Sequence, residues 1–255
     1  MFWTRSFWLP PQGSAFANEV DVLYMALFWL SVFFFVGITG AAVYFSWKYR
    51  YRPGRVTPHM THNTPLEIIW TIVPVIILVM IAVPSFRLLF LQLDEPKPDL
   101  TVKATGKQWY WSYSYPDNGN FEYDSLIVAD KDLKPGQPRL LTADSELVVP
   151  VNKVVHVLVT GADVIHSFSV PSFGIKIDAI PGRINDTWFK ATQEGMFYGQ
   201  CSELCGKDHA FMPISVHVVN DVDFAKWVEA AKKEHSAGNT AAPPNAFAAA
   251  GAPAH

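Results

Sequence analysis

The chain has few cysteines and lacks a motif for covalent haem attachment. Its 255 residues include two cysteines, Cys201 and Cys205, and no Cys-x-x-Cys-His sequence, which is the attachment motif of c-type haem. Its two long apolar segments contain no histidine. These absences exclude covalently attached haem and leave the apolar segments without histidine ligands for a haem iron.

Charged residues are missing from two segments near the N-terminus. Residues 22–47 and 68–86 are uncharged runs of 26 and 19 residues. At about 1.5 Å per helical residue the first is about 39 Å long, and the second is just long enough to cross a hydrocarbon core of ~30 Å. We therefore predict a hairpin of two transmembrane helices, at about 22–47 and 65–93, within an N-terminal unit of residues 1–93.

The loop between these helices is basic, and the rest of the chain is acidic. The loop has four basic residues before the next acid, Glu67, so the positive-inside rule places it in the cytoplasm, or in the matrix of a mitochondrion. Residues 88–255 carry 20 Asp and Glu against 14 Lys and Arg, which favours a basic protein partner and no nucleic acid. The long N-terminal segment and the Ala/Pro-rich tail favour a bacterial inner membrane, with residues 88–255 in the periplasm.

After the hairpin the pattern changes from helical to β. Short runs rich in Val, Thr, Ile and aromatic residues, separated by Gly, Pro and Asp, predict a β-sandwich or barrel in a unit of residues 94–235. These runs are 101–105, 147–149, 154–160, 166–170, 187–190 and 214–219. Apolar residues at helical spacing predict an amphipathic helix at 221–235. Residues 236–255 have no periodicity, and we predict a disordered tail.

The segment with the strongest chemical signal is residues 201–212, CSELCGKDHAFM. Thiolate, thioether and imidazole together favour copper, whereas zinc bound by two Cys and two His would leave Met212 without a role. In an oxidising compartment Cys201 and Cys205 could instead form a disulfide. A disulfide gives no reason for His209 and Met212 to follow, or for His166 at the start of an upstream strand, so copper is favoured over both alternatives.

Several strings, in order, resemble subunit II of haem–copper cytochrome c oxidases. They are EIIWT at 67–71, QWYWSY at 108–113, DVIHSF at 163–168, DAIPGR at 178–183 and YGQCSELCG at 198–206. The resemblance extends over about residues 64–219. It implies a cupredoxin-like Greek-key β-barrel after the membrane hairpin, and a dinuclear copper centre, CuA, that accepts electrons from cytochrome c one at a time.

The resemblance also assigns the copper ligands. It implies that Cys201 and Cys205 bridge both copper ions and that His166 and His209 each bind one. Met212 would complete one ion, and the backbone carbonyl of Glu203 would bind the other. The side chain of Glu203 would hold a magnesium or manganese ion shared with the haem-bearing subunit I, although an isolated loop carboxylate is more often simply solvated.

Further roles follow from the same resemblance. Trp109 would be the point where electrons enter from cytochrome c, while the other aromatic residues of its strand pack in the core. Asp163, with Asp144 and Asp117, would help dock cytochrome c. Glu67 would lie at the mouth of a proton channel into subunit I, and Thr64 with Glu67 also has the form of a helix capping box. The expected neighbours are subunits I and III and membrane lipid.

The resemblance as a whole implies the electron-accepting subunit of a proton-pumping oxidase, in which subunit I reduces oxygen to water. Two rival interpretations are a quinol-oxidase relative and a membrane-anchored binding module. The first has lost the copper ligands, whereas this chain has the complete set. The second would hold its cysteines in a disulfide and have no redox role.

Overall fold

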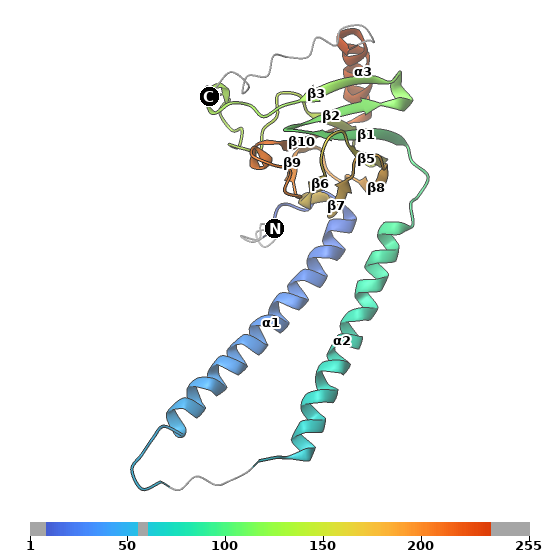
Figure 1. Cartoon of the computed structure of the whole chain (residues 1–255). Helices are drawn as coiled ribbons and strands as arrows, with labels where there is room; N and C mark the ends of the chain where they lie inside the picture. Colours follow the sequence, from blue (N-terminus) through green and yellow to red (C-terminus); the bar gives the residue numbers. More distant parts are fainter. Residues whose placement is uncertain (1–8, 56–60, 236–255) are drawn as a thin grey trace.

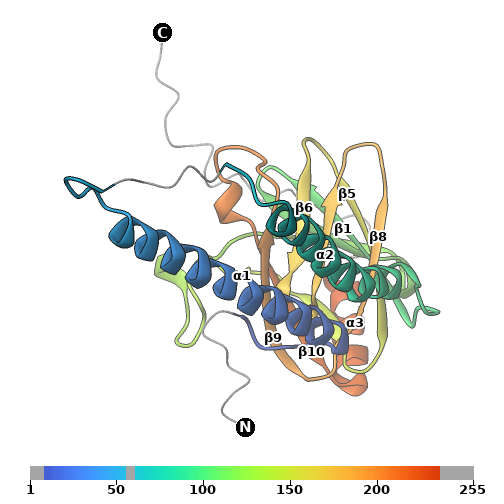
Figure 2. The same ribbon diagram turned by 90° about the horizontal axis from the view of Figure 1, so that it is seen from below.

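The computed structural model describes residues 9–55 and 61–235, so the predicted tail at 236–255 lies outside the described residues. Two long apolar helices, α1 (Ala15–Lys48) and α2 (Thr64–Leu93), extend from one end of a β domain (Figure 1). Both are long and apolar enough to cross a membrane. The predicted hairpin is therefore confirmed, and the view from below shows α2 beneath the part of the domain that contains β8 (Asn185–Lys190) (Figure 2).

Helix α1 begins seven residues earlier than predicted, because its first turn packs on the β domain rather than in lipid. Ser14 caps the helix: its Oγ accepts a hydrogen bond from the Ala17 N–H at 3.0 Å and donates one to the Phe173 carbonyl at 2.8 Å. Gly13 N–H donates to Ser172 O. The buried Ala17 confirms that this turn belongs to the domain interface. The absence of charged residues therefore identifies only the part of helix α1 that is exposed to lipid.

The capping box of α2 is displaced by one residue from its predicted position. The N-cap is Asn63, not Thr64, and its Oδ1 accepts from the Leu66 N–H. The reciprocal bond runs from the Asn63 N–H to Glu67 Oε1 at 3.1 Å. Both exchanged bonds of a capping box are present, so Glu67 does have the predicted structural role.

The β domain contains two five-stranded sheets. The first has the order β3-β2-β1-β5-β8 and the second β4-β10-β9-β6-β7, with the pairs β1–β5 and β4–β10 parallel and the others antiparallel. The other strands are β1 (Leu100–Lys107), β2 (Tyr110–Tyr115), β3 (Phe121–Ser125), β4 (Leu147–Pro150), β5 (Val154–Gly161), β6 (His166–Val170), β7 (Ile175–Ala179), β9 (Gly195–Cys201) and β10 (Pro213–Val219). Each strand expected from composition is present, and the predicted cupredoxin-like sandwich is confirmed.

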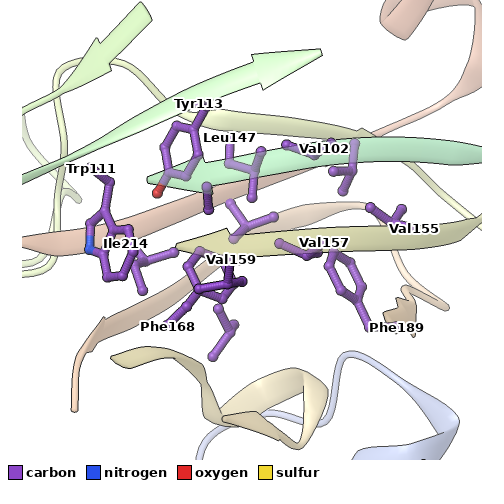
Figure 3. Close-up of a cluster of buried hydrophobic side chains, with 14 of the residues drawn as sticks. Val102, Trp111, Tyr113, Leu147, Val155, Val157, Val159, Phe168, Phe189 and Ile214 are labelled. Atoms are coloured by element: carbon purple, nitrogen blue, oxygen red, sulfur yellow. The ribbon is translucent and has the colours of Figure 1, made fainter. Parts of the chain in front are cut away.

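The core lies between the two sheets and follows the two-residue period of the strands. From β2, Trp111 and Tyr113 are fully buried, and β5 contributes a row of valines beside them. They meet Phe168 and Ile214 from the second sheet (Figure 3). Trp111 and Phe168 are in edge contact, with centroids 5.4 Å apart. This aromatic layer forms the floor beneath the ends of β6 and β9.

Short helical segments connect and cover the strands. The 3₁₀ turns are η1 (Pro116–Asn118), η2 (Asp130–Asp132), η3 (Pro171–Phe173) and η4 (His209–Phe211). Helix α3 (Asp221–His235) is confirmed at its predicted position, and its Trp227 packs against Tyr115 and Phe121. Helix α3 lies on the side of the domain away from the hairpin (Figure 1).

Candidate metal centre

The predicted copper ligands gather where two neighbouring strands of the second sheet meet a loop. Strand β9 ends at Cys201, and the loop that follows leads through η4 into β10. His166 is the first residue of β6, which pairs with β9 through Phe168 and Cys201. Six predicted ligands thus come from two segments of sequence: His166, Cys201, Glu203, Cys205, His209 and Met212.

Their donor atoms lie close together. Cys201 Sγ is 3.9 Å from Cys205 Sγ and 3.9 Å from His166 Nδ1. Cys205 Sγ is 3.5 Å from both His209 Nδ1 and Met212 Sδ. Both cysteines are free thiols, because a disulfide would bring the sulfurs to about 2.05 Å. Bonds from a metal to nitrogen and sulfur of about 2.0–2.3 Å fit within these separations.

The donor set suits copper better than the alternatives. Two thiols, two imidazoles and a thioether are soft or borderline ligands, and the thioether sulfur of the buried Met212 lies 3.5 Å from a thiol sulfur. The Glu203 carbonyl oxygen adds a sixth donor, 3.4 Å from Cys201 Sγ. His166, Cys201, Cys205 and Met212 are all buried, which excludes water from most of the cluster.

A glycine in the opposite sheet makes room for His166. A Cβ placed on Gly106 of β1 would lie 2.9 Å from the Cγ and Cδ2 atoms of the His166 ring. The imidazole is completely buried and also contacts Trp111, with ring centroids 6.1 Å apart. No local sequence pattern marks Gly106 as part of the site, because the contact joins two different sheets.

Asp163 orients the His166 ring. Its carboxylate accepts hydrogen bonds from the Gln108 N–H at 2.6 Å, from the Val164 N–H at 2.6 Å and from His166 Nε2 at 2.8 Å. The contact fixes the proton of His166 on Nε2 and directs the lone pair of Nδ1 toward the cysteines. Burial raises the pKa of Asp163, but these hydrogen bonds outweigh it and lower the pKa below its usual value.

The two thiols differ in acidity. Burial raises the pKa of Cys201, but hydrogen bonds with His166 and with backbone groups of Glu203 and Ser167 outweigh it and lower the pKa to about 6. Burial and the nearby Cys201 charge raise the pKa of Cys205. Cys201 therefore ionises readily, and its negative charge opposes the ionisation of Cys205. A bound cation would favour the thiolate form of both residues.

Trp109 lies against the loop that follows β9. The residue is half-buried, and a Cβ placed on Gly206 would lie 3.2 Å from its Nε1 and Cζ2 atoms. The neighbouring Gln108 donates a hydrogen bond from Nε2 to the Cys205 carbonyl at 2.8 Å. Through this bond the exposed Gln108 is connected to the backbone of the buried Cys205. Gln108 belongs to the QWYWSY string, but nothing in its local sequence indicates this contact.

The other predicted residues occupy different parts of the molecule. Glu203 is exposed on the loop, where its carboxylate is accessible to a partner. Asp144 accepts a hydrogen bond from the Leu126 N–H, just beyond β3, and burial raises its pKa. Asp117 accepts a hydrogen bond from the Thr101 N–H, at the end of β1 opposite Gly106 and about 16 Å from it at roughly 3.3 Å per residue. Glu67 lies at the far end of α2.

Sequence profiles of two families match this chain. One, described as the periplasmic domain of cytochrome c oxidase subunit II, matches residues 100–219, and the other, described as its transmembrane domain, matches residues 3–88. Among curated proteins, "Probable cytochrome c oxidase subunit 2" of Rickettsia bellii is 47% identical over 223 residues, covering 88% of this chain and 83% of the relative. "Cytochrome c oxidase subunit 2" of Cereibacter sphaeroides is 43% identical, covering 87% and 81%.

Solved structures show the same β domain. The periplasmic domain of cytochrome oxidase subunit II (CoxB) from Bradyrhizobium japonicum is 70% identical, with a TM-score of 0.53, covering 55% of this chain and 99% of that structure. Another structure is a mixed disulfide intermediate between a thioredoxin-like protein and a cytochrome c oxidase subunit II, 69% identical with a TM-score of 0.50, covering 57% and 99%. These matches, with the two apolar helices, confirm the predicted placement in a bacterial inner membrane with a periplasmic β domain.

Proposed function

Because this chain belongs to the cytochrome c oxidase subunit II family, we propose that it receives electrons from cytochrome c and passes them to the haem-bearing subunit I of the oxidase. The observation that carries the proposal is the convergence of two thiols, two imidazoles and a thioether at one sheet edge. This complete ligand set argues against the quinol-oxidase alternative.

We propose that these residues hold the dinuclear copper centre CuA, with Cys201 and Cys205 as bridges and the other four as terminal ligands. Bound there, the centre would supply one-electron redox chemistry at a site with little rearrangement. The chain's own contribution is rigidity: Asp163 fixes the His166 tautomer, and the aromatic floor fixes the ring plane. Burial keeps water from the thiolates.

Trp109 is the proposed point where electrons enter. Its indole rests against Gly206 on the metal-binding loop, one residue beyond Cys205. The neighbouring Gln108 adds a second connection to the loop, because its Nε2 donates a hydrogen bond to the Cys205 carbonyl. We propose that a basic cytochrome c docks over this segment, with Asp163 beneath it and Asp144 toward the edge. Asp117, at the opposite end of β1, is proposed to contact cytochrome c only at the rim of that interface.

On the other side of the loop we propose contact with subunit I. The exposed Glu203 carboxylate is an oxygen ligand that suits magnesium or manganese, and the neighbouring Leu204 is 78% exposed, as an interface residue would be in the isolated chain. Phe211 is also exposed. Subunit III and membrane lipid are proposed neighbours of the hairpin. At the cytoplasmic end, Glu67 is proposed to pass protons into subunit I of a proton-pumping enzyme.

A thioredoxin-like partner is a second proposal, drawn from the solved mixed disulfide of a relative. The sulfurs of Cys201 and Cys205 are close enough, at 3.9 Å, for oxidation to join them without copper. A thioredoxin-like dithiol would reduce that disulfide to two thiols and itself become a disulfide. A Cys205→Ser chain whose Cys201 is first converted to a mixed disulfide with a small aromatic thiol should exchange with a thioredoxin-like protein that keeps only its attacking cysteine, releasing the small thiol and leaving a stable disulfide between the two proteins. Absence of that adduct from both single-cysteine variants would contradict the proposal.

Metal analysis and spectroscopy of the purified full chain test the copper proposal. We expect about two copper ions per chain and a mixed-valence electron spin resonance signal. Replacing Trp109 with Phe should slow electron uptake from cytochrome c while copper is retained. A copper-free protein without reactive thiols would refute the centre, and unchanged kinetics in the Trp109 variant would refute its role.

A further inference from the structure

A second cluster of metal-binding side chains lies where the membrane hairpin joins the β domain. Glu95 is two residues beyond the end of α2, His156 is on β5 and Asp186 is on β8. One ligand atom from each lies within 4.8 Å of the other two. His156 Nε2 is 3.2 Å from Glu95 Oε2 and 3.5 Å from Asp186 Oδ2. The three residues come from three separate elements, so their convergence requires the fold.

We propose that Glu95, His156 and Asp186 form a binding site for a divalent cation of the zinc type, separate from the copper ligands. Zinc takes imidazole nitrogen and carboxylate oxygen at about 2.0–2.2 Å, often with three protein ligands and a water. In a tetrahedron with such bonds, neighbouring ligand atoms are about 3.3–3.5 Å apart. The two separations from His156 Nε2, 3.2 and 3.5 Å, are within about 0.1 Å of that spacing.

The orientation of His156 supports a cation between the ligands. Nε2 is buried and has no hydrogen-bond partner among the described residues, although two carboxylate oxygens lie within 3.5 Å. Neither contact therefore has hydrogen-bond alignment. Ligands that share a central ion also lie close together without hydrogen-bond alignment, because the lone pair of the imidazole points at the ion rather than at another ligand.

The charges around the cluster favour the same occupant. No described Lys or Arg lies within 4.0 Å of Glu95 or Asp186, so neither carboxylate is paired with a Lys or Arg of the described ranges. Two carboxylates that converge without a balancing base repel each other unless a cation or a shared proton intervenes. Burial and the nearby Asp186 also raise the pKa of Glu95, although His156 lowers it.

Neighbouring contacts hold the three ligands in place. Gln92, in the last turn of α2, donates from Nε2 to Thr187 Oγ1 at 2.8 Å, and its carbonyl accepts from Trp188 Nε1 at 3.0 Å. These bonds attach α2 to the two residues of β8 that follow Asp186. His156 pairs with Trp188 across the sheet, which places Asp186 diagonally on the same face. A bound ion would therefore cross-link the linker that leaves the membrane to the sheet.

The test uses the copper-loaded full chain in detergent, dialysed against zinc, with zinc and copper counted by mass spectrometry. We expect one zinc ion per wild-type chain and none in Glu95→Gln, His156→Gln or Asp186→Asn, with the copper content unchanged. Each of these substitutions removes a direct zinc ligand. It should therefore weaken zinc binding by more than the roughly 10–100-fold seen when a residue that only hydrogen-bonds to a ligand is removed. X-ray absorption of the zinc should show nitrogen and oxygen neighbours and no sulfur.

A matched control comes from the other sheet of the domain. His217 Nδ1 and Glu146 Oε2 form a similar contact at 3.0 Å with a single carboxylate, so His217→Gln should leave the zinc count unchanged. The proposal is overturned if wild type binds no zinc, as it would if Glu95 and Asp186 share a proton instead, or if all three variants keep it. Failure of the copper centre would appear separately, in the copper count.

Discussion

Replacing Gly106 with alanine should displace His166 and damage the metal centre, although residue 106 is no ligand. The added Cβ would lie 2.9–3.0 Å from three atoms of the His166 side chain, whereas ordinary contacts begin near 3.4 Å. The ring must then move by about 0.5 Å. Complete burial, the Asp163 hydrogen bond and the Trp111 contact oppose that movement.

The expected cost follows from these contacts. Overpacking a dense core costs about 1–3 kcal/mol, and a weakened hydrogen bond to a charged group costs about 1.5–3 kcal/mol. We expect a loss of about 2.5–6 kcal/mol in the free energy of unfolding, or roughly 8–18 °C in the unfolding temperature at about 3 °C per kcal/mol. Copper content should fall in parallel.

Thermal unfolding and copper content of the full chain measure both effects. Gly37→Ala is the control for an added methyl group, because nothing lies within 4 Å of a Cβ placed there, and it should leave the copper content unchanged and not lower the unfolding temperature. An unchanged unfolding temperature and full copper content in Gly106→Ala would refute the argument that Gly106 sets the position of the ring.

Three further predictions concern single polar side chains. Asp163→Asn should lower copper affinity by roughly 10–100-fold, measured by competition with a chelator, because the His166 tautomer is no longer fixed; unchanged affinity would show that the ring needs no such partner. Asp144→Asn should gain unfolding temperature relative to wild type as pH rises from 4 to 7. Burial raises the pKa of Asp144, so the folded wild-type protein holds this proton more tightly than the unfolded chain and loses the resulting stability as pH rises. Parallel plots of unfolding temperature against pH for the two proteins would contradict this. Ser14→Ala should cost about 1 kcal/mol of unfolding free energy in denaturant titrations, because the cap of α1 and the bond to Phe173 are both lost, and a change below a few tenths would show that the first turn does not depend on it.

The parts of the fold that could be predicted are those with local causes. The absence of charge identified both membrane helices, and alternating β-branched residues identified six strands. Strands β3, β7 and β9 were not among the predicted runs, and in β9 Gly195 and Gly199 interrupt the apolar pattern. The early start of α1 was missed because Ser14 caps the helix only when Phe173 is folded against it. Contacts between distant segments therefore set the boundaries that composition does not reveal.

The two metal-binding clusters differ in the same way. Five of the six proposed copper ligands fall within residues 201–212, so their spacing and ligand chemistry are enough to reveal them. Glu95, His156 and Asp186 are dispersed over three elements, and each alone resembles an ordinary surface residue. Their convergence depends on α2 leaving the membrane beside β8, which Gln92 secures. If zinc binds there, its affinity should fall when Gln92 is replaced by Ala, because the linker would no longer hold Glu95 over the sheet, while the copper ligands on β6, β9 and the loop of the other sheet would be unaffected.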